Sequence, residues 1–300
     1  MKSFSFFKLT GLCFLVVQFI PMSLLSGSSL DSPAEGRIIR DLPYVSDGHP
    51  RQKLDLYLSA TPSGPLLVYI HGGSWLMGDK NETESRALFS RGFNVASLNY
   101  RYSTDAVFPA QIQDCKSAIR WLRAHAGDYG YDPKRIGVWG ESAGGYLTAL
   151  LATTGKSREF DVGENLEQSS EIQCAIDFFG PTDLVGWKAP TQDPTIQRSG
   201  GESMFVRLLG GDIEEKQKLA AVASPSTWAS RDSAPLLIVH GSEDLLIPLE
   251  QSRLLFEKLQ AAGADVNLDV ISGAAHQGGL FWTEEKIQQY LKFFNKHLAH

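Results

Sequence analysis

Cysteine is scarce in this chain, which has three cysteines among its 300 residues. Cys13 lies in an apolar N-terminal stretch, so Cys115 and Cys174 are the two left in the rest of the chain. Two cysteines in a domain of this size do not make a disulfide framework. Cys115 follows the apolar face of an expected helix, which predicts a buried free thiol, and a single bridge to Cys174 is the alternative.

Metal and nucleotide motifs are also missing. The sequence has no CxxC or HExxH spacing, and its seven histidines are scattered, so we predict no metal site. The stretch from Gly73 to Lys80 resembles a phosphate-binding loop but has no Ser or Thr after the lysine. The glycines from Gly140 to Gly145 do not match the dinucleotide fingerprint. We therefore expect no nucleotide and no other cofactor.

The sequence has no excess and no run of basic residues. Its 28 Lys and Arg stand against 34 Asp and Glu, which gives a formal net charge of −6. A nucleic-acid-binding face usually needs clustered Lys and Arg, so we expect no nucleic acid partner. A composition of 43% hydrophobic and 21% charged residues is ordinary for a globular protein, and the length suits one large α/β domain.

The N-terminal residues have the pattern of a signal peptide. Lys2 and Lys8 form a weakly basic head, an apolar stretch runs from Leu9 to Ile20, and small residues follow at 26–29. The apolar stretch is short for a membrane span. We predict a cleaved signal peptide over 1–29, a secreted or periplasmic location, and no stable membrane insertion after cleavage. An uncleaved anchor is the alternative.

Apolar strands alternate with amphipathic helices over residues 30–300, which we interpret as one domain. Buried strands that alternate with helices predict an α/β fold, a mostly parallel sheet with helices on both faces. The expected strands are 54–58 (at a sheet edge), 66–70, 93–98, 135–140, 172–179, 236–240 and 266–271. The expected helices are 109–126, 143–151, 249–262 and 283–298, with Thr283 as the N-cap of the last.

Residues 181–233 break this alternation. They contain prolines, glycines, Trp187 and Trp228 but little strand character. Ligands of α/β sheets bind at the carboxyl ends of the strands, so we predict a lid-like excursion over that edge. A plain surface loop is the alternative, although loops of this length in a compact domain usually have a function.

The sequence Gly-Glu-Ser-Ala-Gly at 140–144 is a G-x-S-x-G motif between an expected strand and an expected helix. A serine in such a strand-to-helix turn directs its hydroxyl outward, and the two glycines let the strand and the helix approach each other. The helix N-terminus adds free backbone N–H groups beside the hydroxyl. We predict that Ser142 is a nucleophile.

A serine nucleophile needs a base and a carboxylate that orients the base. His276 lies in a glycine-rich turn after a late strand and is the predicted base, whereas His240 ends a buried strand and is interpreted as structural. Asp244, in the tight turn that follows, is the predicted acid, with Glu243 as the alternative. The order Ser142, Asp244, His276 is typical of α/β-hydrolases.

The segment His-Gly-Gly-Ser-Trp, which ends at Trp75, follows the expected strand 66–70. Glycines at such a place let the backbone approach a substrate and turn its N–H groups inward. We predict that Gly73, Ser74 and Ala143 donate to an oxyanion and that Gly72 shapes the turn. Trp75 is predicted to line the acyl pocket, with a core position beneath the loop as the alternative.

The segments His-Gly-Gly-Ser-Trp at 71–75, Gly-Glu-Ser-Ala-Gly-Gly at 140–145 and His-Gly-Ser-Glu-Asp at 240–244 together resemble the α/β-hydrolase esterases related to the hormone-sensitive lipases, in particular the bifunctional feruloyl and acetyl-xylan esterase-like branch. The resemblance covers residues 38–300 and implies an α/β-hydrolase fold and carboxylic-ester hydrolysis without a cofactor. The segment that contains Arg101 and Asp114 also resembles that branch, and a pair between them would be structural. Ser74 stands where many relatives have a third glycine, which implies a narrower acyl pocket.

We therefore expect a secreted serine carboxylesterase that forms an acyl-enzyme. Its expected substrates are short-chain or aromatic acyl esters, with acetyl or feruloyl groups on polysaccharide as candidates. One alternative is a prolyl-oligopeptidase-like serine peptidase, although such enzymes usually carry a propeller domain. Another is a non-catalytic binding module on a hydrolase scaffold, although such modules generally lose a triad member. A formamidase or lactonase is a further possibility within the fold.

Overall fold

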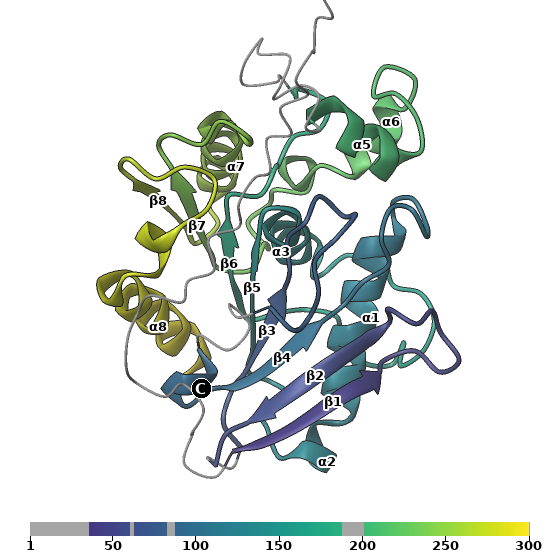
Figure 1. Cartoon of the computed structure of the whole chain (residues 1–300), viewed down its shortest axis with the longest axis vertical. Helices are drawn as coiled ribbons and strands as arrows, with labels where there is room; N and C mark the ends of the chain where they lie inside the picture. Colours follow the sequence, from purple (N-terminus) through teal and green to yellow (C-terminus); the bar gives the residue numbers. More distant parts are fainter. Residues whose placement is uncertain (1–35, 61–62, 83–87, 188–200, 300) are drawn as a thin grey trace, which may run out of the picture. The chain divides into compact units, whose positions relative to one another are not determined.

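A central sheet organises the part of the chain that the computed structural model describes, residues 36–60, 63–82, 88–187 and 201–299. The predicted signal peptide lies outside these residues. Within them the sheet has eight strands in the order β1-β2-β4-β3-β5-β6-β7-β8 (Figure 1). The strands are β1 (Arg37–Pro43), β2 (Lys53–Leu58), β3 (Leu66–Ile70), β4 (Asn94–Leu98), β5 (Ile136–Glu141), β6 (Cys174–Phe178), β7 (Leu236–Gly241) and β8 (Val266–Ile271).

The sheet is mostly parallel, as predicted. β2 pairs antiparallel with β1 and with β4, and every other pair of neighbours is parallel. The α-helices in the described ranges are α1 (Ala110–Ala124), α2 (Ala126–Tyr129), α3 (Ala143–Thr154), α5 (Gly201–Leu209), α6 (Gln217–Val222), α7 (Leu249–Ala262) and α8 (Glu284–Leu298). Short 3-10 helices cover Phe89–Arg91, Pro225–Thr227 and Gly279–Trp282.

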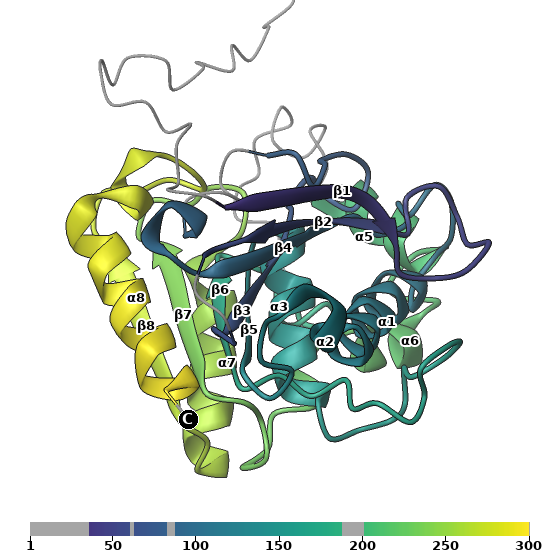
Figure 2. The same ribbon diagram turned by 90° about the horizontal axis from the view of Figure 1, so that it is seen from below.

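Both faces of the sheet are buried, and β3 shows why its sequence is apolar throughout. Leu66, Val68 and Ile70 point into one hydrophobic cluster, whereas Leu67 and Tyr69 point into another. The first cluster includes side chains of α1, α3 and α7, and the second includes side chains of α8. Figure 2 shows helices on both sides of the sheet, so the predicted α/β arrangement is confirmed.

The edge of the sheet differs from the prediction. The strand expected at the edge, β2, pairs on both sides and is buried over nearly its whole length. The edge strand at this end of the sheet is β1, whose side chains are mostly exposed and whose pairing with β2 is interrupted by a bulge between Ile39 and Leu42. Asp41, inside the bulge, has a φ of 59°. The sequence does not predict β1 because most of its side chains are exposed, and the two that pack against the core, Ile39 and Leu42, are separated by the bulge.

The excursion between β6 and β7 contains more regular structure than the sequence indicated. Its described parts, 181–187 and 201–233, include α5, α6 and the 3-10 turn before β7. Phe205 and Leu208 of α5 are part of the core, and the backbone N–H of Phe108 donates to Leu208 O at 2.7 Å. The excursion is therefore anchored to the domain, and its role as a lid stays a prediction.

Both cysteines of the described chain, Cys115 and Cys174, are free and buried, so they do not form the bridge kept as an alternative. Their thiols lie in different hydrophobic clusters, on opposite faces of the sheet.

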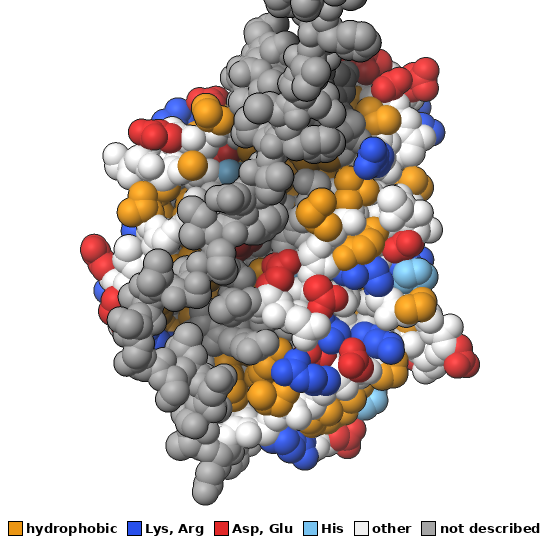
Figure 3. Space-filling view, in the orientation of Figure 1, with side chains coloured by type: hydrophobic (Ala, Val, Ile, Leu, Met, Phe, Trp, Pro, Cys, Tyr) orange, Lys and Arg blue, Asp and Glu red, His pale blue; other side chains and the backbone are white. Residues whose placement is uncertain are grey.

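Among the described residues, no helix combines the length and apolar character needed to cross a bilayer. On the face shown in Figure 3, acidic and basic side chains are intermingled.

Candidate active site

Ser142 occupies a strained turn between β5 and α3. Its φ of 54° and ψ of −116° lie in a region that residues with a side chain rarely adopt. A Cβ on Gly140 would lie 2.5 Å from Gly144 O, and one on Gly144 would collide with Ile70 O of the neighbouring strand. Both motif glycines are therefore required by close backbone packing, and this packing holds the serine at the end of β5.

The structure brings Ser142, His276 and Asp244 together from segments far apart in the sequence. His276 Nε2 lies 3.0 Å from Ser142 Oγ, and His276 Nδ1 lies 2.7 Å from Asp244 Oδ2. Both distances are hydrogen bonds of the length needed for proton transfer from the hydroxyl to the imidazole. This arrangement can generate a serine nucleophile at neutral pH.

The Asp244 carboxylate is held from both of its oxygens. Oδ1 accepts the backbone N–H groups of Leu246 and Ile247 at 2.8 and 2.9 Å. Burial alone would raise the pKa of Asp244, but hydrogen bonds from His240, His276 and the backbone outweigh it and hold this pKa well below its usual range. The carboxylate is therefore ionised and fixed in position beside the His276 ring.

His240 is structural in the sense predicted, and it also touches the same carboxylate. Its ring is fully buried, with Nδ1 2.7 Å from Ser252 Oγ and Nε2 2.9 Å from Ile247 O. Nε2 also lies 3.2 Å from Asp244 Oδ2. The spacing of four residues between a strand-end histidine and the acid is the signal that could have predicted this contact. Glu243, the alternative acid, is exposed.

Phe179 is a site residue that the sequence analysis did not identify. It follows β6 with a φ of 44°, and its ring centroid lies 4.7 Å from that of His276. The ring also packs edge-on against Phe281, at 4.9 Å. Phe179 therefore forms an apolar support on one side of the imidazole. No motif marks it, because the contact arises where β6 and the loop after β8 meet.

The loop predicted to hold the oxyanion lies against the serine turn. A Cβ on Gly72 would lie 3.5 Å from Ser142 Cβ. Gly73, Ser74 and Trp75 have φ values of 101°, 53° and 58°, and such successive left-handed conformations turn backbone N–H groups to one side. Ser74 thus occupies a position where the third glycine of many relatives would be unstrained.

The backbone N–H groups predicted to act as donors remain available. Within the described ranges, the N–H groups of Gly73, Ser74 and Ala143 have no acceptor. Ala143 begins α3, so its N–H also lies at the positive end of the helix dipole. The arrangement suits an oxyanion between the two loops, and the assignment of these donors stays a prediction.

Trp75 takes the core position that the sequence left as an alternative. The residue is 1% exposed. Its indole packs edge-on against Tyr146, with 5.1 Å between ring centroids, and in a tilted arrangement against Phe205, at 5.7 Å. Tyr146 belongs to α3 and Phe205 to α5. The side chain thereby connects the oxyanion loop, the serine helix and the excursion, and direct contact with an acyl group stays a prediction.

Arg101 and Asp114 form the pair expected from the sequence. Arg101 donates to both carboxylate oxygens of Asp114, at 2.7 Å from Nη2 and 2.9 Å from Nε. Asp114 is buried and also accepts from Gln52 at 2.7 Å. The pair connects α1 with the loop after β4 and lies outside the triad. Its role is therefore structural.

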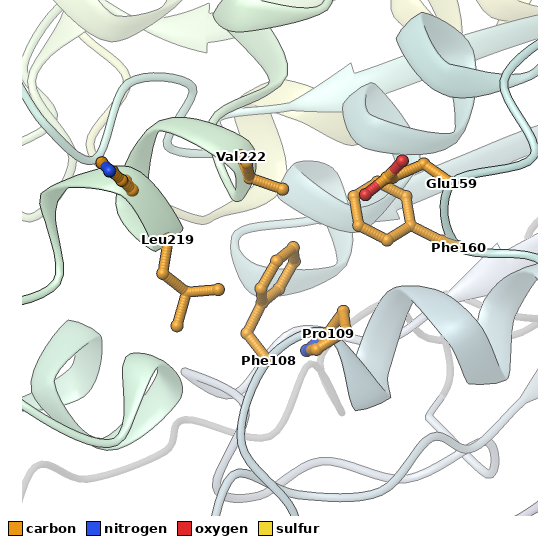
Figure 4. Close-up of a pocket in the computed structure, with 7 residues that line it drawn as sticks. Phe108, Pro109, Glu159, Phe160, Leu219 and Val222 are labelled. Carbon is orange, nitrogen blue, oxygen red and sulfur yellow. The ribbon is translucent and has the colours of Figure 1, made fainter.

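A surface groove elsewhere in the domain contains none of the predicted site residues. Figure 4 shows its aromatic side chains, Phe108 and Phe160, whose ring centroids are 5.7 Å apart. The remaining lining residues are Pro109, Glu159, Lys218, Leu219 and Val222.

In the described part of the chain, no group of three or more His, Cys, Asp or Glu side chains could hold a metal ion.

Comparison with known proteins agrees with this geometry. The model of the BD-FAE family matches residues 54–259. Among curated proteins, "Probable carboxylic ester hydrolase LipM" of Mycobacterium tuberculosis is 30% identical over 256 residues, which cover 78% of this chain and 56% of LipM. The chain thus spans about half the length of the curated relatives it matches.

Two solved structures have the same fold over most of this chain. One is described as a truncated carbohydrate esterase from gut microbiota (TM-score 0.79, 26% identity, 88% of this chain and 97% of that one). The other is a bifunctional GH43-CE protein of Bacteroides eggerthii (TM-score 0.77, 29% identity, 87% of this chain and 35% of that one). With its family match, its parallel sheet and its serine turn, the chain belongs to the BD-FAE family of α/β-hydrolases.

Proposed function

We propose that this protein is a serine carboxylesterase. The observation that carries the proposal is the hydrogen-bonded series from Ser142 Oγ to His276 Nε2 at 3.0 Å and from His276 Nδ1 to Asp244 Oδ2 at 2.7 Å. Family membership and the esterase descriptions of its relatives support the same reaction class. No metal or cofactor is invoked, since the three side chains and backbone N–H groups supply a complete acyl-transfer site.

The proposed reaction has two halves with the same proton carrier. Ser142 Oγ attacks the ester carbonyl as His276 Nε2 takes its proton, and Asp244 stabilises the imidazolium. The N–H groups of Gly73, Ser74 and Ala143 bind the oxyanion. His276 then protonates the leaving alcohol, and the acyl group stays on Ser142. A water molecule, deprotonated by His276, attacks this acyl-enzyme. His276 then returns that proton to Ser142 Oγ as the bond to the acyl group breaks and the acid leaves.

Short-chain or aromatic acyl esters are the proposed substrates, with acetyl or feruloyl groups on polysaccharide as candidates. Two structural neighbours are described as carbohydrate esterase and GH43-CE proteins, which supports an ester carried by a carbohydrate. Trp75, Tyr146 and Phe205 form a packed aromatic group beside the serine helix, and this packing favours a small acyl site. Export through the N-terminal segment belongs to the same proposal.

The test is an ester panel with an inactive variant. Nitrophenyl esters from acetyl to octanoyl, methyl ferulate, acetylated xylan and a peptide anilide are assayed with the wild-type protein and with Ser142→Ala. We expect kcat/KM to be highest for acetyl to butyryl or feruloyl esters and the variant to lose about 10⁴- to 10⁶-fold in turnover. Intact-mass measurement should detect the acyl adduct on wild-type protein and not on the variant.

Each other outcome contradicts part of the proposal. Preferred cleavage of the anilide would indicate a peptidase, and activity on neither class would indicate a binding module. A kcat/KM that rises from acetyl through octanoyl would contradict the short-chain preference, because each additional buried methylene adds about 0.8 kcal/mol only where a pocket accepts it. Near-native ester hydrolysis by Ser142→Ala would remove the serine from the mechanism.

A further inference from the structure

Arg51 lies outside the predicted triad but contacts both ends of the loop between β3 and Asp79, residues 71–78, which contains the predicted oxyanion donors Gly73 and Ser74 and is called the oxyanion loop. It precedes β2, and its side chain is 16% exposed. Its Nη2 lies 3.1 Å from His71 Nε2, at the start of the loop, and donates to Gly78 O at 3.2 Å, at the end. Its Nε donates to Tyr100 O at 2.8 Å. The guanidinium therefore connects the His71 ring with two backbone carbonyls, those of Gly78 and Tyr100.

The guanidinium is further fixed by an aromatic face and a carboxylate. Its central carbon lies 3.6 Å from the ring centroid of Tyr102, a cation–π contact. The carboxylate oxygen Oδ2 of Asp79 lies 3.9 Å from Arg51 Nη1. The Tyr102 hydroxyl itself donates to Gly78 O at 2.5 Å. These contacts leave the Arg51 side chain little freedom to turn away from His71.

The contact between Arg51 and His71 determines which ring nitrogen of His71 carries the proton. A guanidinium is always protonated and only donates, so His71 Nε2 must accept. The proton of a neutral imidazole is then on Nδ1, which lies 2.8 Å from Gly72 O and donates to it. Burial lowers the pKa of His71 to about 4, and the Arg51 charge acts in the same direction. The ring is therefore neutral around pH 7.

The hydrogen bond to Gly72 O has a consequence for the next peptide N–H. The Gly72–Gly73 peptide is trans, so its C=O and N–H point in opposite directions. A Gly72 carbonyl held toward the His71 ring turns the Gly73 N–H away from that ring. The ring stacks on Tyr100 at 4.4 Å between centroids and is fully buried, so it cannot follow if the peptide flips.

We propose that Arg51 is a positioning residue for the oxyanion loop, because it fixes the Nδ1–H tautomer of His71 and thereby directs the Gly73 N–H at the substrate carbonyl oxygen. The inference rests on the proposed esterase function. Arg51 touches no reacting atom in it. Its effect passes through the His71 ring and one peptide plane, so it should act on the transition state, where the oxygen is charged, far more than on the bound ester.

The test uses Arg51→Gln with Arg253→Gln as its matched control. Arg253 is on the surface of α7 and pairs only with exposed Glu250 among the described residues. Active sites are counted by titration with a fluorophosphonate, so that unfolded protein does not enter kcat. We expect Arg51→Gln to lower kcat per titrated site about tenfold to a hundredfold with little change in KM, below the 10²- to 10³-fold loss typical when an oxyanion donor is removed outright. The affinity for a boronic acid, which mimics the tetrahedral oxyanion, should fall by the same factor.

Two His71 variants separate a tautomer effect from a loss of packing. The amide nitrogen of Asn can occupy the place of Nδ1, whereas that of Gln reaches the place of Nε2. We therefore expect His71→Asn to retain more kcat per titrated site than His71→Gln. Adding Arg51→Gln to His71→Gln should cost little more, because both changes act through one hydrogen bond. If Arg51→Gln does not fold, the Asn and Gln comparison decides the inference.

The results that would overturn the inference differ from those that would overturn the esterase function. Wild-type protein without ester hydrolysis contradicts the function itself. An active wild type in which Arg51→Gln keeps kcat per titrated site, or loses only titratable sites, contradicts the role of Arg51. Additive losses in the double variant, or equal activity of His71→Asn and His71→Gln, would show that the tautomer is not what matters.

Discussion

Asp244 holds two histidines that have different surroundings. His276 is partly exposed and faces Ser142, whereas His240 is buried and its other nitrogen contacts Ser252. Because two backbone N–H groups occupy Oδ1, the carboxylate cannot rotate away from either ring. The position of the Asp244 carboxylate thus depends on residues from the end of β7, through the following turn, to α7.

The neighbouring acids should differ sharply in importance. Asp244→Asn should lower kcat about 10⁴-fold, because an amide cannot stabilise the imidazolium and disturbs the tautomer of His276. Glu243→Gln should leave kcat nearly unchanged, since its side chain is exposed. Steady-state kinetics on the same nitrophenyl ester would check both. A comparable loss in the two variants would contradict the choice of Asp244.

Asp177 provides a pH-dependent prediction inside the core. It is fully buried in β6, Oδ1 accepts Gly180 N at 2.9 Å, and Oδ2 has no hydrogen-bond partner in the described part of the chain. Burial raises its pKa to about 6. Below the pKa of about 3.9 that an unfolded Asp has, the carboxyl is protonated in both the folded and the unfolded protein, and it does not change the free energy of unfolding. As the pH rises from about 3.9 through the higher pKa of the folded state, only the unfolded protein readily loses the proton, so the free energy of unfolding falls.

The expected result is a stability difference that grows with pH. Asp177→Asn should match the wild-type dependence below about pH 4 and gain up to about 3 kcal/mol in relative unfolding free energy above about pH 7, from roughly two pKa units at 1.36 kcal/mol each. Urea unfolding at several pH values would measure this. A difference that stays constant from pH 4 to pH 8 would show that Asp177 does not titrate in this range.

At the scale of elements, the last helix closes the second face of the sheet. Tyr290, Phe293 and Phe294 of α8 are buried in the cluster that contains Leu67 and Tyr69. The predicted N-cap is confirmed, since the Thr283 side chain accepts the backbone N–H of Lys286 at 3.3 Å. Glu284 and Glu285 in the first turn complement the positive helix end.

Removal of this cap should therefore lower stability and spare catalysis. Thr283→Ala should cost about 1 kcal/mol of unfolding free energy, and Thr283→Ser should restore most of it because the capping oxygen returns. The denaturant midpoint and the kcat per titrated site of the three proteins are the measurements. Equal midpoints for the alanine and serine variants would mean that the cap contributes nothing.

Elements whose sequence signal is local could be predicted, and those that depend on partners could not. The sequence predicts β3, α7 and β8 with the bounds that the structure has, because an apolar run marks β3, a helical period marks α7, and alternating apolar and polar residues mark β8. β1 has no such signal, since its stability comes from pairing with β2. The helix α5 in the excursion is not predicted, for a related reason. Its residue Phe205 packs against Trp75, 130 residues earlier in the chain, and local sequence does not indicate such a distant partner.

At the scale of the whole molecule, the same distinction applies to the site. Ser142, Asp244 and His276 each sit in a short motif after a strand, so the sequence indicated all three and the structure brings them together. Arg51 and Phe179 have no motif. Their contacts with His71 and His276 exist only after β-strands far apart in the sequence have been placed side by side.

The bulged edge strand has a consequence for the behaviour of the protein in concentrated solution. An open sheet edge exposes backbone groups that another chain can pair with, which leads to aggregation. In β1 the bulge between Ile39 and Leu42 interrupts the ladder, and Asp41 and Arg40 place charges beside it. The edge is therefore a poor template for adding a further strand, and replacing the exposed Arg40 with valine should promote fibrillar association on gentle heating while the active site remains intact.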